Sequence, residues 1–409
     1  MTLLAITGGR VIDPASGFDG PATVVLVDRV IASVGRFEAP DDAEIIDASG
    51  LVVAPGLIDA GVFQASPAAC HAGGITRVVL MPDQRPPLDD PALVAFTRGA
   101  GKPDVWVHPL VAATRGLAGQ ELAEIGLGQA AGAVGAATGR GAIDNSAVMH
   151  RLLSYATAFN LPVVTHAEDG ALTAGAVATE GDYATRLGLP AAPAFAEALA
   201  VARDIRLAEA TGARIHIRQL TTAEGITLVR AAQARGVAVT AGITPAHWLL
   251  NETAVAEFRS FARLSPPLRS DSDRRAVQDA IADGTIGIIA SGHDPRTQED
   301  KRLPFADALP GMAGAETLLA LSLSLVQSGA LTLTQLLATM TVTPARLFGL
   351  PGGTLATGSP ADLVVFDEVA PWRIDGDRFQ GAGNTPFDGL PVSGRVRMTI
   401  KGGDVVWRS

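Results

Sequence analysis

Apolar and polar positions follow two different patterns along the chain. Near both ends, short runs rich in β-branched residues are separated by turn-forming residues, as expected of antiparallel strands. The clearest runs cover residues 23–27, 30–35, 361–367 and 396–407. Because the same pattern occurs at both ends, we expect residues 1–50 and 346–409 to form one small β-sandwich domain.

Between these ends, eight apolar runs alternate with segments of helical pattern. This alternation is typical of parallel βα units. The strands are expected near residues 51–60, 76–81, 104–108, 132–136, 161–166, 213–220, 237–243 and 286–291. Eight such units predict an α/β fold, a (β/α)8 TIM-type barrel over residues 51–345, with any active site at the carboxyl ends of the strands.

Two helix starts agree with this register. Thr221 lies three residues before Glu224, and Ser270 lies three residues before Asp273, a spacing that is typical of capped helix N-termini. The helices that follow are expected to stop at Gly236 and Gly284, because glycine readily takes the left-handed conformation that ends helices.

Composition favours a cytoplasmic protein that binds neither nucleic acid nor membranes. The 409 residues are 47% hydrophobic, enough for a large core. A net charge of −10 argues against a general nucleic-acid surface. The first ten residues lack the pattern of a signal peptide, and no apolar run approaches membrane-spanning length. The single cysteine, Cys70, excludes an internal disulfide and a cysteine-based zinc cage.

Short motifs occur in a fixed order over almost the whole chain. They read Pro55-Gly56-Leu57-Ile58-Asp59, Met81-Pro82-Asp83, Thr165-His166-Ala167-Glu168, Thr244-Pro245-Ala246-His247, Pro266-Pro267-Leu268-Arg269, Gly311-Met312-Ala313-Gly314 and Ala361-Asp362-Leu363-Val364. The ordered set resembles the dihydroorotase-like branch of the amidohydrolase superfamily. That resemblance implies a metal-bound hydroxide that opens or closes the dihydroorotate ring, with an aspartate that carries the proton.

Most of the family's functional positions carry other residues here. The resemblance places two histidine ligands at the end of strand one, a ligand after strand four, a histidine on strand six and the aspartate on strand eight. In that order the chain has Gly61, Phe63, Thr138, Gln219 and Gly292. Of the family's metal ligands, only His166 on strand five is retained. We therefore expect no catalytic residue and no metal, with zinc bound only if a reorganised hydrolase site exists.

Four polar residues are expected to remain around the barrel mouth as a remnant pocket. These are Asp83, His166, His247 and His293. His166, with Glu168 and Asp169 beside it, could hold one weak metal ion, but a hydrogen-bonded relic of the ancestral site is the simpler interpretation. His247 and His293 are likewise interpreted as structural residues.

The resemblance and the replaced positions together predict a catalytically inactive dihydroorotase homologue. Similar silent chains accompany bacterial aspartate carbamoyltransferase, so this chain is expected to be its structural or regulatory partner in pyrimidine biosynthesis, in a dodecamer-type assembly. Two alternatives stay open. One is an active cyclic-amide hydrolase with a single metal or a reorganised site. The other is a small-molecule sensor that uses Asp83, His166, Arg218 and His247.

Overall fold

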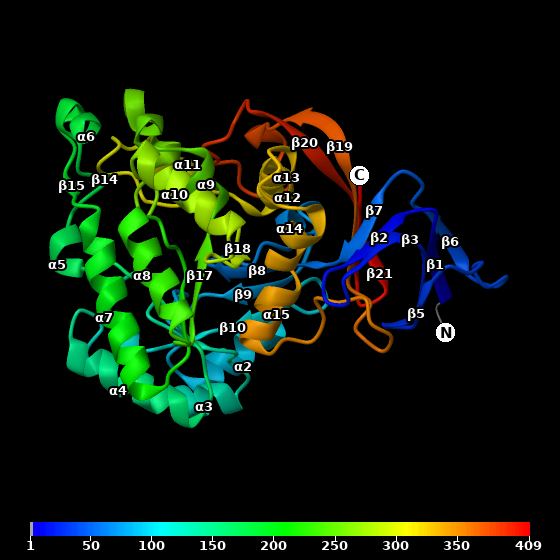
Figure 1. Cartoon of the computed structure of the whole chain (residues 1–409), viewed down its shortest axis with the longest axis horizontal. Coiled ribbons are helices and arrows are strands. Elements are labelled where there is room, and N and C mark those ends of the chain that lie inside the picture. The colour runs from blue at the N-terminus through cyan, green and yellow to red at the C-terminus, as the bar shows by residue number, and fades with distance from the viewer. Residues whose placement is uncertain (1–2) are drawn as a thin grey trace.

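Eight parallel strand positions close into a barrel that lies beside a β-rich unit made by both ends of the chain (Figure 1). The computed structural model describes residues 3–409. Helices surround the barrel, and the β-rich unit lies at its side, where the strands near both termini meet. The expected TIM-type barrel with a terminal β-sandwich is confirmed.

The barrel strands are short and follow one another in chain order. They are β8 (Leu57–Val62), β9 (Ile75–Leu80), β10 (Trp106–Pro109) with β11 (Val111–Ala112), β12 (Ala136–Ala137), β13 (Val163–Thr165), β16 (Ile215–Ile217), β17 (Val239–Ile243) and β18 (Ile288–Ile289). The third position is divided at Leu110, whose N–H bonds to Leu80. The barrel closes where the Phe63 N–H donates to the His293 carbonyl at 3.0 Å.

Helices and short turns connect these strands. The helices are α1 (Pro67–Ala72), α2 (Pro91–Ala100), α3 (Ile125–Ala130), α4 (Ser146–Ala158), α5 (Gly170–Thr173), α6 (Asp182–Leu187), α7 (Phe195–Thr211), α8 (Ala223–Ala234), α9 (Pro245–Leu249), α10 (Asp271–Ala282), α11 (Gln298–Arg302), α12 (Leu318–Ser322), α13 (Ser324–Gln327), α14 (Leu333–Thr339) and α15 (Val342–Phe348). A small pair of strands, β14 (Ala178–Thr179) and β15 (Ala191–Ala192), lies outside the barrel. Within residues 3–409, no helix has the length and apolar character needed to cross a membrane.

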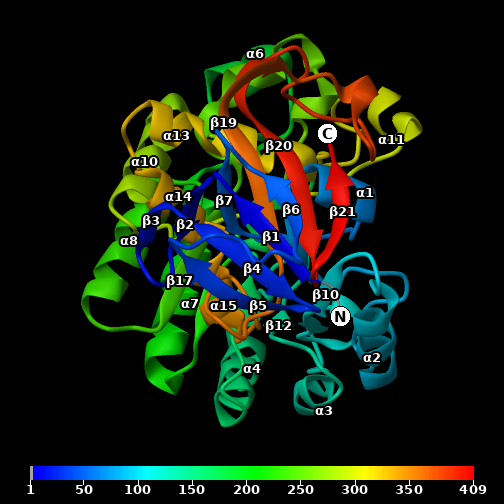
Figure 2. The ribbon, with the colours of Figure 1, turned by 90° about the vertical axis from the view of Figure 1, so that its right-hand side faces the viewer.

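The terminal unit consists of two sheets packed face to face (Figure 2). One contains β5 (Val30–Gly35), β4 (Thr23–Val27), β1 (Leu3–Thr7) and β6 (Glu44–Asp47). The other contains β21 (Asp404–Arg408), β20 (Pro391–Lys401), β19 (Leu363–Arg373), β7 (Val52–Pro55), β2 (Arg10–Asp13) and β3 (Phe18–Pro21). Their facing side chains form a separate hydrophobic core, to which Leu26 and Val365 contribute.

Two segments differ from the sequence-based expectation. Residues 51–60 form two strands, because β7 joins the terminal sheet and β8 enters the barrel after Gly56. A side chain cannot fit at this crossing, since a Cβ at Gly56 would lie 2.4 Å from the Thr76 hydroxyl. The fourth strand, expected at 132–136, covers only Ala136–Ala137, and Gly132 with its φ of +109° belongs to the preceding loop.

The two helix starts gave one confirmed cap and one correction. Ser270 caps α10, and its hydroxyl accepts the Asp273 N–H as expected. The cap of α8 is Thr222 and not Thr221. The Thr221 side chain is instead committed to the buried carboxylate of Glu197.

A buried ion pair joins the barrel to the terminal unit. Arg77 on β9 donates from Nη2 to the Asp362 carboxylate at 2.5 Å, and both side chains are almost fully buried. The other Asp362 oxygen accepts the Trp106 indole N–H at 3.2 Å. This pair connects strand β9 of the barrel with the residue that precedes β19 in the terminal unit.

Candidate functional site at the barrel mouth

The end of the first barrel strand carries a glycine and a phenylalanine in place of ligands. Gly61 has a φ of +90°, and a Cβ at this position would lie 3.2 Å from Cδ of Arg218. The Phe63 ring is buried, and the Arg140 guanidinium carbon lies 3.7 Å from its centroid. The guanidinium carbon of Arg218 lies 5.0 Å from the same centroid. Two cationic groups therefore lie against the ring at the centre of the mouth.

Arg140 crosses the mouth from the loop after strand four to the loop after strand eight. Its Nη2 donates to Oδ1 of Asp294 at 2.8 Å, and its Nη1 also contacts this carboxylate. Arg296 binds Oδ2 of Asp294 at 2.8 Å. Asp294 is thus shared by two arginines and does not act as a proton partner for its neighbour His293.

Asp83 anchors the loop after strand four through a hydrogen bond with the backbone of Arg140. Its Oδ1 accepts the Arg140 backbone N–H at 2.8 Å, while its buried Oδ2 has no hydrogen-bond partner within residues 3–409. Burial raises the pKa of Asp83, although the N–H and the charges of Arg140 and Arg218 oppose this effect. The side chain therefore acts as a loop anchor.

His166 is committed on both ring nitrogens. Its Nε2 lies 3.0 Å from Oε2 of Glu168, and its Nδ1 lies 3.4 Å from Nη2 of Arg218. Since an arginine only donates, Nδ1 accepts and Nε2 carries the hydrogen. The backbone N–H of His166 donates to the Thr138 hydroxyl at 3.0 Å. The one retained family ligand therefore has no free lone pair to offer a metal ion.

Glu168 links His166 to Arg269 in one hydrogen-bond network. Its Oε1 accepts from Nη2 of Arg269 at 2.7 Å. Burial raises the pKa of Glu168, but its hydrogen bond with His166 and the charge of Arg269 outweigh this effect and lower the pKa to about 2. Each carboxylate oxygen accepts a hydrogen bond, so Glu168 is an ionised structural partner of His166 and Arg269.

Glu197 on α7 completes the buried network. It accepts backbone N–H groups of Thr221 and Thr222 and both of their hydroxyl groups. The Arg269 guanidinium lies 3.6 Å from its carboxylate. Glu197 is fully buried, and it fixes the loop that follows strand six.

His247 and His293 have structural roles, because both ring nitrogens of each imidazole form hydrogen bonds within the protein. His247 binds the Thr244 hydroxyl at 2.8 Å and the Pro266 carbonyl at 3.1 Å. His293 lies 3.1 Å from the Ser66 hydroxyl, and its Nδ1 accepts backbone N–H groups of Gly314 and Ala315. Burial lowers the pKa of both imidazoles to about 4.

The remaining replaced positions line the mouth without new catalytic groups. Gly292 has a φ of +63°, and a Cβ there would lie 2.8 Å from Cγ2 of Thr244. The buried Oε1 of Gln219 has no hydrogen-bond partner within residues 3–409. Thus the position of the family's proton-carrying aspartate has neither a side chain nor space for one.

These residues do not fit a catalytic metal ion. Residues 3–409 contain no group of three or more histidine, cysteine, aspartate or glutamate side chains arranged to hold one. Arg218, whose pKa burial lowers only to about 10, stays charged at neutral pH beside His166. A divalent cation at this place would meet that guanidinium and Arg140 at close range, which Coulomb repulsion opposes.

The space left at the mouth is small. The cavity lined by Phe63, Arg140, Arg218 and Gln219 has a volume of about 60 Å³. Pockets for drug-sized ligands usually measure roughly 300–1,000 Å³. A single small group fits here, but a cyclic amide ring with its substituents does not.

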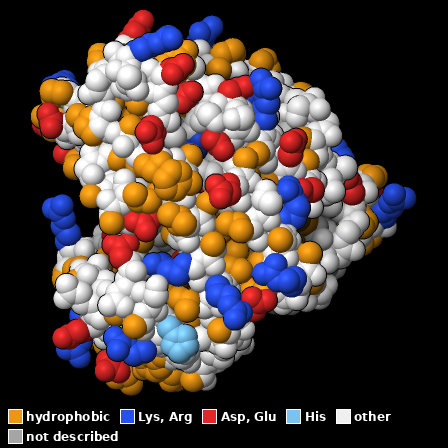
Figure 3. All heavy atoms as spheres, turned by 60° about the vertical axis from the view of Figure 1, so that its left-hand side comes forward, with side chains coloured by type: hydrophobic (Ala, Val, Ile, Leu, Met, Phe, Trp, Pro, Cys, Tyr) orange, Lys and Arg blue, Asp and Glu red, His pale blue; other side chains and the backbone are white. Residues whose placement is uncertain are grey.

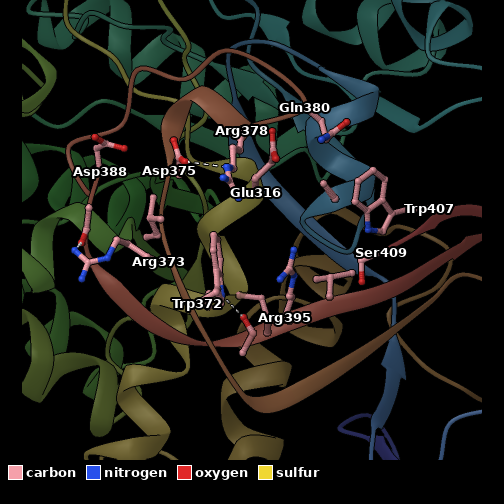
Figure 4. Close-up of a pocket in the computed structure, with 17 residues that line it drawn as sticks. Glu316, Trp372, Arg373, Asp375, Arg378, Gln380, Asp388, Arg395, Trp407 and Ser409 are labelled. Carbon is pink, nitrogen blue, oxygen red and sulfur yellow. Dashed lines mark hydrogen bonds and ion pairs between the residues drawn. The ribbon is translucent and has the colours of Figure 1, made fainter.

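A wider hollow of about 620 Å³ lies elsewhere, under the hairpin of β19 and β20 (Figure 4). Its walls include Trp372, Arg395 and an ion pair of 3.1 Å between Arg378 and Asp375. It shares no lining residue with the barrel mouth. Its lining carries charges of both signs and the hollow is open to solvent. None of its lining residues is a histidine or cysteine that could serve as a metal ligand for the family's hydrolysis.

Sequence reasoning placed several of these residues but missed their partners. The structure brings Phe63, Gln219, Gly292 and His247 to one cavity. The contacts of Arg140 and Arg218 with Phe63, and the anchoring role of Glu197, were not expected. One sequence feature could have indicated these contacts: Arg218 directly precedes Gln219, a position where the family has a metal ligand.

Comparison with known proteins agrees with the fold and these motifs. The amidohydrolase family profile matches residues 113–406, and the chain belongs to this family. Among relatives, a dihydroorotase of Syntrophotalea carbinolica is 40% identical over 99% of both chains. A dihydroorotase of Anaeromyxobacter dehalogenans strain 2CP-1 is 42% identical over 99% of this chain and 98% of its own. Within the family, the chain is a dihydroorotase-like amidohydrolase homologue.

Solved structures give the same fold. The L-hydantoinase (dihydropyrimidinase) from Arthrobacter aurescens superposes with a TM-score of 0.89 at 25% identity, covering all of this chain and 96% of its own. A dihydropyrimidinase from Brevibacillus agri gives a TM-score of 0.84 at 22% identity, covering 100% and 95%. At 22% identity, the similarity to the Brevibacillus agri structure shows a shared fold and nothing further.

Proposed function

We propose that this chain is a catalytically silent dihydroorotase homologue that works as a structural or regulatory partner of aspartate carbamoyltransferase. The observation that carries the first half is the pair of guanidinium groups on the Phe63 ring. They lie at the end of strand one, where the family resemblance requires a metal ion. The barrel keeps its scaffold and has lost the groups needed for hydrolysis.

The reaction chemistry argues in the same direction. A catalytic metal lowers the pKa of bound water from 15.7 to about 7, and a general base adds roughly 10² to 10⁴ in rate. Here the base position is Gly292, and the retained His166 is bound to Glu168 and Arg218. The described residues therefore supply neither a source of hydroxide nor a carrier for the proton.

The second candidate is an active dihydroorotase. It is favoured by relatives of that name that are about 40% identical over the full chain. This function would require a metal arrangement different from the one that the resemblance implies. A ring-opening assay with dihydroorotate, run with and without added zinc, separates the two candidates directly.

The partner role uses the outside of the barrel. Figure 3 shows one outer face, where hydrophobic side chains lie among Lys, Arg, Asp and Glu side chains. Such mixed surfaces are usual for non-obligate protein interfaces. Phe96 on α2 and Phe195 on α7 are 75% and 51% exposed, so each helix offers an apolar contact. A stable complex should bury roughly 1,200 Å² or more, and closed symmetric assemblies of dodecamer type are the expectation.

The test is to mix the purified chain with aspartate carbamoyltransferase from the same organism. We expect co-elution as a larger particle and an altered carbamoyltransferase rate, with no dihydroorotate turnover by this chain. Phe96→Asp and Phe195→Asp change two different helices, and the variant that still co-elutes is the control for the one that does not. Separate elution with an unchanged rate at micromolar concentration would contradict the partner role, and turnover would favour the second candidate.

A further inference from the structure

The arginines of the barrel mouth fall into two groups. Arg140 and Arg296 share Asp294, and Arg269 binds Glu168. Arg218 and Arg263 form no ion pair with any carboxylate within residues 3–409. Two guanidinium groups therefore lie at the mouth without a direct ion pair, although the charges of Asp83, Asp294 and Glu168 act on Arg218 and that of Glu168 acts on Arg263.

Both unpaired guanidinium groups also have unused donors. Nε of Arg218 and Nε of Arg263 are buried and have no hydrogen-bond partner within residues 3–409. Arg218 makes a single long contact, to His166, and Arg263 donates only to the carbonyls of Leu264 and Ala176. Since an arginine offers five N–H donors in a fixed fork, each side chain can still donate hydrogen bonds to an oxyanion.

Leaving these charges unpaired is costly. Burial lowers the pKa of both Arg218 and Arg263, and the charges of Asp83 near Arg218 and of Glu168 near Arg263 only partly offset this effect. A buried charge without a partner is among the strongly destabilising features of a protein interior. A bound anion would offset this penalty most strongly at Arg218, because Arg218 is buried and Arg263 is only partly buried.

The two arginines face neighbouring hollows. Arg218 and Gln219 line the cavity of about 60 Å³, and Arg263 lines a hollow of about 190 Å³. Both hollows are bounded by the same four residues, Arg140, Leu264, Ser265 and Pro310. The two therefore adjoin, with one unpaired arginine in each.

We propose that the two adjoining hollows bind a small organic dicarboxylate, with one carboxylate on Arg218 and the other on Arg263. A planar carboxylate matches the fork of a guanidinium. The inner cavity suits a short carbon chain better than a fully hydrated phosphate, because Phe63 and Met312 are apolar walls. This binding site consists of residues of this chain alone and requires no partner protein.

Other carboxylates at the mouth do not compete for this anion. Asp294 is held by two arginines, and Glu168 by Arg269 and His166. Asp83 accepts the Arg140 backbone N–H. The bound dicarboxylate thus meets the two guanidinium groups that no carboxylate within residues 3–409 contacts directly.

Calorimetric titration and thermal unfolding of the full chain test the proposal. The probes are succinate, butyrate as a monocarboxylate with the same number of carbons, and inorganic phosphate, all against sodium chloride at equal ionic strength. We expect succinate to bind and raise the melting temperature, with butyrate about tenfold weaker or more because it loses one charge-assisted contact. Phosphate should give no shift beyond that of the salt.

Variants assign the two ends of the ligand. Arg263→Met should abolish the preference for succinate over butyrate, and Gln219→Leu should weaken both acids. Arg218→Met should abolish binding, and the other two variants decide the matter if it does not fold. Arg235→Met changes an exposed arginine that pairs with Glu209, and it should leave binding unchanged. Equal shifts from succinate and sodium chloride, or binding that survives Arg263→Met with its preference intact, would overturn the proposal.

Discussion

Arg218 occupies the space that a side chain at position 61 would need. A Cβ on Gly61 would lie 3.2 Å from Cδ and 3.3 Å from Cγ of Arg218. The missing histidine on strand one and the arginine after strand six are therefore two parts of one arrangement. Restoring the ligand at one position requires moving the residue at the other.

The purified chain should contain no stoichiometric zinc. The residues at the mouth provide no free ligand set, and the guanidinium groups of Arg140 and Arg218 repel a divalent cation. Metal analysis by mass spectrometry should find well below one ion per chain, and a chelator should leave the melting temperature unchanged. Carbonic anhydrase, a zinc enzyme, is the positive control. One or more tightly bound zinc ions per chain would contradict this expectation.

Gly61→His should destabilise the fold without giving dihydroorotase activity. The positive φ and the contact with Arg218 together cost about 2–4 kcal/mol in the free energy of unfolding, measured with urea. Gly50→His is the matched control, because Gly50 has a φ of +76° and nothing within 4 Å of its Cβ position. The control should lose only about 1–2 kcal/mol. Measurable ring opening by Gly61→His would refute the argument that the site needs several groups at once.

Gly292→Asp should also fail to restore turnover. The added side chain meets Cγ2 of Thr244 at 2.8 Å from its Cβ, in a backbone conformation with a φ of +63°. A carboxylate alone supplies a base without a metal-bound nucleophile. We expect a lower melting temperature and no signal in the dihydroorotate assay, and turnover above the background rate would count against the silent role.

Arg77→Met should be far more damaging than loss of an exposed ion pair. It leaves the buried Asp362 carboxylate without its cation, which typically costs about 3–5 kcal/mol. Arg230→Met is the matched control, because Arg230 pairs with Asp283 at 2.6 Å on the surface. The control should cost about 0–1 kcal/mol. Similar unfolding free energies for the two variants would show that the Arg77 pair does not hold the barrel and the terminal unit together.

Acid should destabilise the protein below about pH 6.5. Burial lowers the pKa of His108 and His216 to about 3, and of His247 and His293 to about 4. These imidazoles stay neutral when folded and gain protons when unfolded, so the stability they contribute is present above pH 6.5 and is lost as pH falls toward 4. At pH 5 each histidine accounts for at most about 2 kcal/mol.

His216→Gln tests this pH dependence at one residue. The fall in unfolding free energy between pH 7 and pH 5 should be smaller in this variant than in the parent protein. His150→Gln, at an exposed position on α4, is the control. Parallel pH profiles for His216→Gln and the parent would rule out His216 as a source of the acid sensitivity.

The barrel could be predicted from sequence because each strand is an apolar run followed by a helix. The exceptions have local causes. The apolar pattern continues through Gly56, so nothing in it marks the point where the chain leaves the terminal sheet. The fourth strand is only two residues long, and a run that short carries no readable period.

The replaced positions Gly61, Phe63, Thr138, Gln219 and Gly292 could be located from the sequence, because the family resemblance assigns each of them. What fills their place could not. Strand β16 ends at Ile217, so the alternation of side chains no longer fixes the direction of Arg218. The pairing of Arg140 with Asp294 joins residues 154 positions apart, and only the closed barrel brings them together.

The division of the terminal unit between the two chain ends also sets an order for its synthesis. The sheet of β1, β4, β5 and β6 uses only residues 3–47 and can assemble as soon as they leave the ribosome. The second sheet cannot be completed then, because β7 pairs with β19, more than three hundred residues later, and only β2, β3 and β7 are available early. The part of the first sheet's apolar face that β19 and β20 cover therefore stays open while the barrel is translated, and such exposed surface is what chaperones bind during translation.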